Sequence, residues 1–419
     1  MRILKLTAAV EKQLLRARQQ RDVEAERISA RIIAEVRQRG DGALFAWAKK
    51  LDGAELRRDG AWISRRQMRM AEKRARGEFL DALRHAERNV RRVAERQLPQ
   101  PWTVEVEPGV KIGQMVRPID TIACYIPGGR HALVSTLMMT VVPARAAGVK
   151  RVVVVCPRPN AELLAAASLL GVTELARIGG AQAIGALAYG TKSVPRVDKI
   201  FGPGNRFVTA AKQLVSSDCA IDLPAGPTEA IVLASRGNPR WIAADLLAQA
   251  EHSPDAGSYF VTTSPQLAQR VQMEVVTQLK RLSKNNPAQI SIRRTGSIVL
   301  AASVNAACEF VNRFAAEHLS LPGATNTLPE NIRAAGTVFL GPWGAQPLGD
   351  YASGSNHVLP TGGWARMRGG LSTADFVKCI GVQSISRKGF GRLVDDVQTL
   401  AHAEGMLAHA NAVEVRRWK

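Results

Sequence analysis

Residues 197–215 read VDKIFGPGNRFVTAAKQLV, and this stretch decides the fold class. A short apolar run over 199–201 leads into Gly202–Pro203–Gly204, and helical periodicity follows over 206–215. A strand that passes through a glycine turn into a helix is the repeating unit of a parallel sheet covered by helices. The same unit is therefore expected to recur on either side.

The unit recurs over residues 120–225 and again beyond residue 229. In the first region, apolar runs that predict strands alternate with helical periodicity, and glycine or proline follows most strand ends. The second region has expected strands over 230–233, 259–262, 297–300 and 338–340, and expected helices over 241–251 and 266–282. The sequence therefore predicts an α/β fold of two Rossmann-like domains with parallel-sheet cores. Ligands of such sheets bind beyond the carboxyl ends of the strands.

The two ends of the chain differ from this pattern. Residues 1–100 are rich in Arg, Glu, Ala and Leu at helical spacing, which predicts helices there. Residues 389–408 predict a helix near the C-terminus.

Composition limits the possible classes of protein. The 419 residues are 46% hydrophobic and 22% charged, which is typical of a folded globular chain. We expect no membrane association, because no window approaches the roughly 18 uninterrupted apolar residues of a membrane span, and no secretory leader is recognised. The five cysteines are odd in number and widely spaced, so we expect free thiols and a cytoplasmic location.

The formal net charge of +21 raises nucleic acid as a possible partner. Arginines of the N-terminal third are interleaved with acids, as in Glu24–Ala25–Glu26–Arg27, which is typical of solvated helix faces. No nucleic-acid-binding motif accompanies the charge. Nucleic acid is therefore kept only as an alternative partner.

Several polar groups could carry chemistry, although spacing alone selects no reaction. Gln249 and His252 are three residues apart at an expected helix end, where both could contact one ion or merely cap the helix. Glu317 and His318 follow an expected helix and could form an acid–base pair or an exposed terminus. The polar loop 349–357 is expected to be functional.

Nine motifs, taken in order, are similar to those of the histidinol dehydrogenase family. They are YIPGG at 125–129, GGAQAIGALAYGT at 179–191, VDKIFGPGNRFV at 197–208, IDLPAGPTEA at 221–230, ADLLAQAEH at 244–252, AAEHL at 315–319, GDYASGSNHVLPT at 349–361, GLSTADF at 370–376 and AEGMLAHANAV at 403–413. The resemblance covers nearly the whole chain. It implies an NAD-dependent oxidation of L-histidinol through L-histidinal to L-histidine, with one zinc ion per site of a homodimer.

The resemblance also implies a role for particular residues. Glu317 and His318 would be catalytic, with His318 taking the hydroxyl proton and Glu317 activating water. The implied zinc ligands are Gln249, His252, Asp350 and His409, with His409 supplied across the dimer interface. The implied NAD contacts are Tyr125, Gln182 and Asn205. The implied substrate contacts are Thr228, Gln249, His252, His318, Asp350, His357, Glu404 and His409.

This chain departs from the family pattern at two places. Thr228 stands where the family usually has Ser, which keeps the hydroxyl and adds a methyl group. Arg130–His131 follows YIPGG where the family often has smaller residues. Another NAD-dependent dehydrogenase of a small amino or sulfonated alcohol, and a nucleic-acid-binding protein on a vestigial enzyme fold, are the alternatives to histidinol oxidation.

The expected domains complete these predictions. They are a helical arm over 1–20, a discontinuous α/β domain over 21–124 and 229–370 with the metal and catalytic residues, an NAD-binding α/β domain over 125–228, and a helical dimerisation tail over 371–419.

Overall fold

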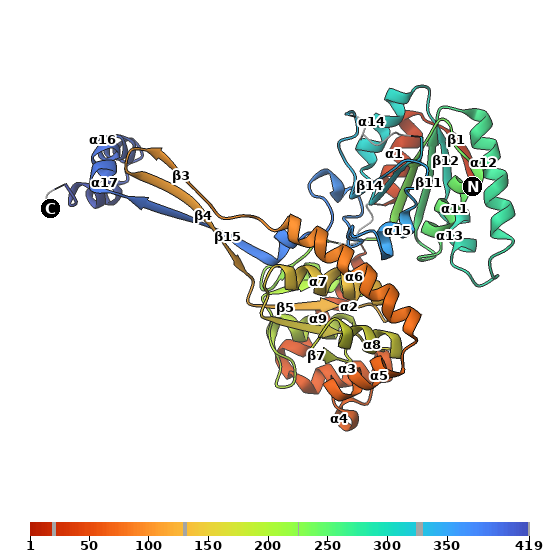
Figure 1. Ribbon diagram of the computed structural model, residues 1–419, viewed down its shortest axis with the longest axis horizontal. Helices are drawn as coiled ribbons and strands as arrows, with labels where there is room; N and C mark the ends of the chain where they lie inside the picture. The colour runs from red at the N-terminus through yellow and green to blue at the C-terminus, as the bar shows by residue number, and fades with distance from the viewer. Residues whose placement is uncertain (19–21, 129–131, 225, 324–329, 418–419) are drawn as a thin grey trace.

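The computed structural model describes residues 1–18, 22–128, 132–224, 226–323 and 330–417. Two α/β units lie side by side, and a narrow extension projects from one of them (Figure 1). Each unit is built on a six-stranded sheet, and the extension is built on a three-stranded one. Arg130–His131 lies outside the described residues.

The strand–turn–helix stretch at 197–215 belongs to one of the two six-stranded sheets, which we name sheet 2. Its strand order is β2-β7-β6-β5-β8-β9. Its strands are β2 (Trp62–Ile63), β5 (Thr121–Tyr125), β6 (Arg151–Val155), β7 (Glu174–Ala176), β8 (Lys199–Phe201) and β9 (Ala220–Ile221). All neighbours are parallel except β2, which pairs antiparallel with β7. The chain moves outward from β5 through β6 and β7, then returns to the other side of β5 at β8. The strand order therefore reverses between β5 and β8.

Helices cover both faces of sheet 2. They are α2 (Val23–Arg39), α3 (Asp41–Asp52), α4 (Leu56–Asp59), α5 (Arg65–Arg74), α6 (Gly77–Gln97), α7 (Val134–Ala146), α8 (Ala161–Leu169), α9 (Gly180–Tyr189) and α10 (Arg206–Val215). α2 packs on α9 and α10, whereas α5 and α6 pack on α8 and α7. A separate apolar core lies on each face, because alternate residues of the strands point to opposite sides.

The other six-stranded sheet, sheet 1, is parallel throughout and has the order β1-β12-β11-β10-β13-β14. Its strands are β1 (Arg2–Lys5), β10 (Glu229–Leu233), β11 (Gly257–Thr262), β12 (Ser297–Leu300), β13 (His318–Leu321) and β14 (Thr337–Leu340). The helices of this unit are α1 (Ala8–Ala17), α11 (Pro239–Ala250), α12 (Pro265–Leu279), α13 (Ala288–Arg294), α14 (Val304–Phe314) and α15 (Gln346–Tyr351). Here the order reverses between β10 and β13.

Two of the expected domain boundaries are wrong. Residues 1–20 form no separate arm, because β1 pairs with β12 and Leu14 of α1 is buried in the core of sheet 1. Residues 21–124 do not join 229–370, because α2–α6 cover sheet 2 and β5 is one of its central strands. Helical periodicity predicts that each helix has a buried face, but it does not say which sheet covers that face.

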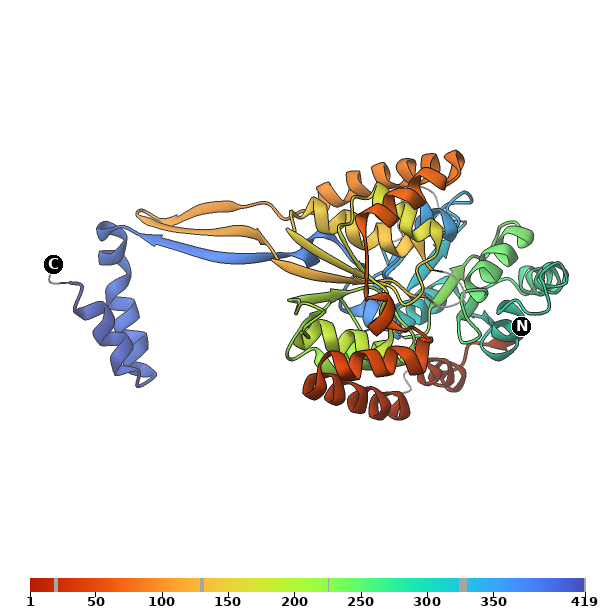
Figure 2. The same cartoon turned by 90° about the horizontal axis from the view of Figure 1, so that it is seen from below.

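The expected helical tail over 371–419 is only partly helical. After the short 3-10 turns at Trp364–Arg366 and Thr373–Phe376, β15 (Val377–Ile385) pairs antiparallel with β4 (Val110–Pro118), which also pairs with β3 (Trp102–Glu107). These strands form sheet 3, and α16 (Arg387–Ala403) and α17 (Leu407–Glu414) lie at its far end (Figure 2). Strands β3 and β4 were not anticipated from sequence.

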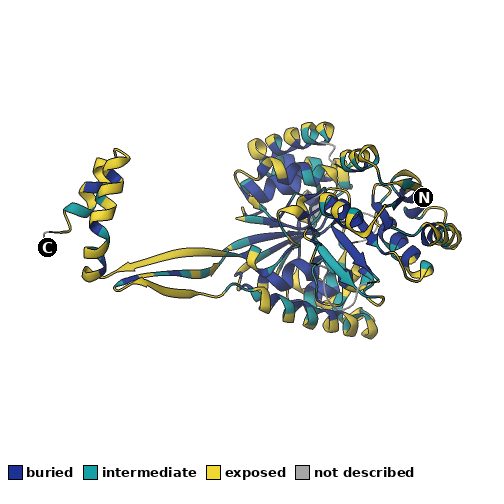
Figure 3. Ribbon diagram, turned by 90° about the horizontal axis from the view of Figure 1, so that it is seen from above, coloured by how far each residue is buried: buried dark blue, intermediate teal, exposed yellow. Residues whose placement is uncertain are grey.

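Sheet 3 and its helices are covered by little else in the chain, and much of their surface is exposed (Figure 3). Their exposed large apolar side chains are Trp102, Val104, Val106, Met115, Ile380, Val382, Ile385, Val397, Leu400, Met406, Leu407 and Val415. A thin sheet with exposed apolar side chains along its length is a candidate contact surface for another protein. In the described residues, no helix is long and apolar enough to cross a membrane.

Candidate active site

The candidate catalytic residues meet at the amino ends of two neighbouring strands of sheet 1. Thr228 directly precedes β10, and Glu317 directly precedes β13, whose first residue is His318. The parallel register pairs Ala230 with His318, so these strand ends lie side by side. These residues therefore lie at the amino edge of sheet 1, where the rule that ligands bind beyond carboxyl ends does not place them. Glu317 and His318 also lie at a strand start, three and four residues beyond the end of α14, and not at a helix terminus.

Glu317 is almost fully buried and is held by two donors. Its Oε2 accepts hydrogen bonds from the Thr228 hydroxyl at 2.5 Å and from the Glu229 backbone N–H at 3.0 Å. Burial raises the pKa of Glu317 above its ordinary value, and this effect exceeds the opposing influence of the His318 imidazole. The carboxyl group is thus fixed in position and more basic than a solvated one.

His318 lies between two carboxyl groups and is 3% exposed. Its Nδ1 is 3.7 Å from Glu317 Oε2, and its Nε2 is 3.6 Å from Asp350 Oδ1. Burial alone would lower the pKa of His318, but the two carboxylates outweigh burial and raise it. Neither ring nitrogen has a hydrogen-bond partner among the described residues. Buried polar atoms are nearly always satisfied, so two unsatisfied ring nitrogens mark His318 as a candidate functional residue.

Gln249, Gln346 and Asp350 form a hydrogen-bonded group beside this pair. Gln249 is fully buried on the last turn of α11 and donates from Nε2 to the Thr228 hydroxyl at 2.8 Å. Gln346 Nε2 donates to Gln249 Oε1 at 2.8 Å and lies 3.4 Å from Asp350 Oδ2. The nearby His318 imidazole lowers the pKa of Asp350, although burial opposes it with the largest single effect. Two oxygen atoms thus converge on one amide nitrogen.

Sequence reasoning missed Gln346. Its one available signal was the i,i+4 spacing to Asp350, which places both residues on the same face of α15. The spacing gave no reason to connect either of them with Gln249, which is far away in sequence.

Three donor side chains of one chain at this position are candidates to hold a zinc ion. His252 is exposed, and its Nδ1 lies 3.1 Å from the Ala248 carbonyl oxygen, so Nδ1–H can donate there and leave Nε2 for a metal. Together with Gln249 Oε1 and the Asp350 carboxylate, it makes a mixed nitrogen and oxygen set that zinc accepts. Across the described ranges, no three His, Cys, Asp or Glu side chains are grouped to hold a metal.

His409 and Glu404 do not join the site within one chain. Both are exposed, Glu404 at the end of α16 and His409 on α17, far from sheet 1 at the tip of the extension (Figure 1). The structure therefore brings together Gln249 and Asp350, with His252 two residues beyond the end of α11. It leaves Glu404 and His409 far from this group in the same chain.

His357 connects the two α/β units. Its Nε2 is 3.1 Å from the Thr136 hydroxyl on α7, and its Nδ1 is 2.9 Å from the Asp350 carbonyl oxygen. Burial lowers the pKa of His357, which favours the neutral ring. Both ring nitrogens already have partners, so His357 acts first as a support for Asp350.

The expected NAD contacts lie at the carboxyl ends of sheet 2. Tyr125 ends β5, Gln182 lies on the first turn of α9 beyond β7, and Asn205 precedes α10 beyond β8. The Tyr125 hydroxyl accepts from Gly180 N–H at 3.2 Å, and Gln182 Oε1 is buried without a partner among the described atoms. Asn205 Oδ1 caps α10 by accepting from two backbone N–H groups. The edge therefore offers one unsatisfied polar atom, Gln182 Oε1, beside a helix N-terminus.

The turn after β8 requires glycine. Gly202 has φ +108°, and a Cβ there would lie 2.2 Å from the Tyr125 carbonyl oxygen. The Gly202 N–H donates to Asp222 Oδ2 at 2.7 Å, and its carbonyl oxygen accepts from Lys212 at 2.8 Å. Lys212 and Asp222 form a buried ion pair, so the turn is rigidly held where the strand order of sheet 2 reverses.

Two largely parallel sheets, with a candidate acid–base pair and candidate metal donors at the amino edge of one of them, are typical of an α/β enzyme. A family model described as histidinol dehydrogenase matches residues 15–417. The histidinol dehydrogenase of Methanothermobacter thermautotrophicus is 45% identical over 92% of each chain, and that of Aquifex aeolicus is 43% identical over 94% of this chain and 93% of its own. The crystal structure of histidinol dehydrogenase from Elizabethkingia anophelis superposes with a TM-score of 0.94 at 35% identity, covering 99% of this chain and 97% of the other. The chain belongs to the histidinol dehydrogenase family.

Proposed function

We propose that this chain oxidises L-histidinol through L-histidinal to L-histidine, the final step of histidine biosynthesis, with NAD as the hydride acceptor. One observation carries the proposal beyond family membership: both nitrogens of the buried His318 lack partners and face two carboxyl groups. A buried base without a partner, next to a fixed carboxylate, fits a reaction that removes one proton from an alcohol and another from water.

His318 is the proposed base for the alcohol. When it takes the hydroxyl proton, the ring becomes positively charged between Glu317 and Asp350, at nitrogen–oxygen distances of 3.7 and 3.6 Å. The two carboxylates stabilise that charge, which is the physical meaning of the raised pKa of His318. The hydroxyl proton therefore has a prepared acceptor.

Glu317 is the proposed base for water at the aldehyde stage. Its Oε2 is held by Thr228 and the Glu229 N–H, and its other oxygen has no hydrogen bond among the described residues. That free oxygen can orient a water molecule and take its proton as the water adds to the aldehyde carbon. Thr228, which replaces the usual Ser, retains the hydroxyl that fixes Glu317.

Zinc is the proposed metal, held by Gln249, His252 and Asp350 of one chain and by His409 of the partner chain. When bound, it would orient the imidazole and amine of the substrate, which is a positioning role. His252 supports this proposal because its Nδ1 faces a carbonyl oxygen and leaves Nε2 free. Glu404 and His357 are proposed to line the substrate site, and Tyr125, Gln182 and Asn205 the NAD site.

The proposed assembly is a homodimer with shared active sites. The extension of sheet 3, α16 and α17 presents apolar side chains to solvent and carries Glu404 and His409 away from their own unit. Burying that apolar surface against a second copy would stabilise the extension and deliver both polar residues to the partner's site. We also propose a cytoplasmic location, which the five free cysteines support.

The test is NADH formation from L-histidinol, compared with a panel of other small amino and sulfonated alcohols. We expect two NADH per histidinol, and loss of activity on chelation that zinc restores. One NADH per substrate, or faster oxidation of another alcohol, would instead support a related dehydrogenase. DNA retention at moderate salt without NADH formation would support the nucleic-acid alternative.

A further inference from the structure

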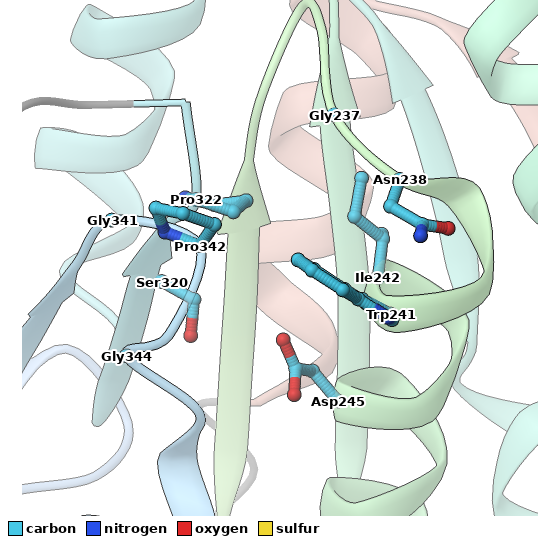
Figure 4. Close-up of a pocket in the computed structure, with 10 residues that line it drawn as sticks. All are labelled: Gly237, Asn238, Trp241, Ile242, Asp245, Ser320, Pro322, Gly341, Pro342 and Gly344. Carbon is cyan, nitrogen blue, oxygen red and sulfur yellow. The ribbon is translucent and has the colours of Figure 1, made fainter.

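A pocket lies toward the carboxyl end of sheet 1, whereas the candidate catalytic residues lie at its amino end. The strand order of this sheet reverses between β10 and β13, and the pocket lies alongside the carboxyl-terminal ends of these two strands, between α11 and the turn after β14 (Figure 4). In open parallel sheets, the reversal point at the carboxyl ends is the usual ligand position. In sheet 2, the reversal point carries Tyr125 and the turn at Gly202. The corresponding reversal point in sheet 1, between β10 and β13, is not used at its carboxyl end by the reaction proposed above.

The walls of the pocket are partly aromatic and partly polar (Figure 4). Trp241 and Asp245 extend from one face of α11 toward Ser320 and Pro342, which belong to β13 and the turn after β14. The cavity has a volume of about 50 Å³. A site for one water needs about 10–15 Å³, so this cavity has room for a small polar head with one or two carbons, and none for a nucleotide.

Asp245 is the charged group of the pocket. Its carboxylate has no hydrogen bond or ion pair with any described residue, and burial alone raises its pKa to about 6. The other lining residues are uncharged: Gly237, Asn238, Trp241, Ile242, Ser320, Pro322, Gly341, Pro342 and Gly344. A carboxylate without a countercharge repels phosphates and attracts cations.

An aromatic surface adjoins the carboxylate. The rings of Trp241 and Trp343 lie with centroids 5.3 Å apart and planes tilted by 42°, and Trp343 is 78% exposed. Indole faces attract organic cations and also contact their alkyl groups. An exposed tryptophan pair next to a lone carboxylate is therefore a surface for an organic cation more than for a metal ion, which would need several oxygen ligands.

We propose that this pocket binds a small alkylammonium cation, with the ammonium group against Asp245 and the alkyl group against Trp241. The site goes beyond the proposed dehydrogenase reaction and does not depend on it. Asp245 and Gln249 are four residues apart on α11, which is about 6 Å along the helix axis. The cation would thus lie about one helical turn from Gln249 along α11, on the side toward the carboxyl end of the sheet.

The test measures binding of ethylammonium to the full-length chain by calorimetry and by the indole N–H resonance of Trp241, assigned with Trp241→Phe. Ethanol is the uncharged ligand control, and sodium chloride keeps the ionic strength constant. Asp245→Asn keeps the shape of the side chain and removes its charge. Asp255→Asn is the matched control, because Asp255 is an exposed acid paired with Arg294 in the same unit.

We expect ethylammonium to bind the unaltered chain and Asp255→Asn equally, and Asp245→Asn at least about tenfold more weakly. We also expect binding to the unaltered chain to weaken about tenfold from pH 7.5 to pH 5, because protonation of a group with a pKa near 6 removes the charge. Equal binding of ethanol, or unchanged affinity in Asp245→Asn, would overturn the proposal. If Asp245→Asn fails to fold, a pH-independent affinity in the unaltered chain overturns it instead.

Discussion

Replacing Glu317 with Gln should separate the two oxidation steps. The structure makes this substitution informative because Oε2 of Glu317 accepts both of its hydrogen bonds, from Thr228 and the Glu229 N–H. A glutamine carbonyl oxygen can accept the same two bonds, and its NH2 group then occupies the place of the other oxygen. The side chain should keep its position and lose only its ability to take a proton.

The expected magnitude follows from that single change. Loss of a positioned general base typically slows the step it serves by about 100- to 10,000-fold. We expect this loss in oxidation of histidinal, where Glu317 activates water, and a much smaller loss in the first hydride transfer from histidinol. Because burial raises the pKa of Glu317, a neutral Gln should not destabilise the fold at pH 7.

Single-turnover NADH formation, measured separately from histidinol and from histidinal, checks this expectation. His318→Asn is the comparison, and it should slow the histidinol step, with partial recovery at higher pH. Zinc content and thermal unfolding must match those of the unaltered chain. Oxidation of histidinal by Glu317→Gln at the normal rate would refute the assigned role. Equal loss of both steps in both variants would show that the pair acts as one unit.

Three other predictions concern the metal donors, the turn after β8 and the pocket acid. Neither the His252→Ala nor the His409→Ala homodimer should retain activity. Heterodimers that combine one chain of each variant should regain up to about half of normal activity, which is measured after the heterodimers are verified. No recovery would mean that His409 acts within its own chain. Gly202→Ala should lower the unfolding free energy by about 2 kcal/mol or more and raise KM for NAD, because the added Cβ meets the Tyr125 carbonyl oxygen. The control Gly42→Ala should have neither effect, because a Cβ there has nothing within 4 Å. Equal melting temperatures of the two variants would contradict this prediction. Asp245→Asn should be more stable than the unaltered chain above pH 6, by at most about 2–3 kcal/mol, and no more stable below pH 4. The reason is that a buried acid with a raised pKa makes the folded protein less stable as pH rises through the folded pKa of about 6. Denaturant unfolding at pH 4 and pH 8 measures the difference.

The sequence by itself determined the repeating units and most of the candidate chemistry. The stretch 197–215 predicted a strand, a glycine turn and a helix, and β8, the turn at Gly202 and α10 are arranged in that way. These features are local, because a few neighbouring residues specify each of them: the apolar run of a strand, a turn that needs positive φ, and a helix cap. The nine ordered motifs likewise placed the chain in its family, as the comparisons confirmed.

Only the tertiary structure decided how these units combine. It placed α2–α6 on sheet 2, gathered Thr228, Glu317 and His318 at the amino ends of sheet 1, and joined Gln249 to Asp350 through Gln346. It also paired β4 with β15, across more than 250 residues of chain. A periodic pattern shows that a face must be buried or a strand edge paired, but the partner is chosen by packing between segments far apart in sequence, which no local pattern encodes.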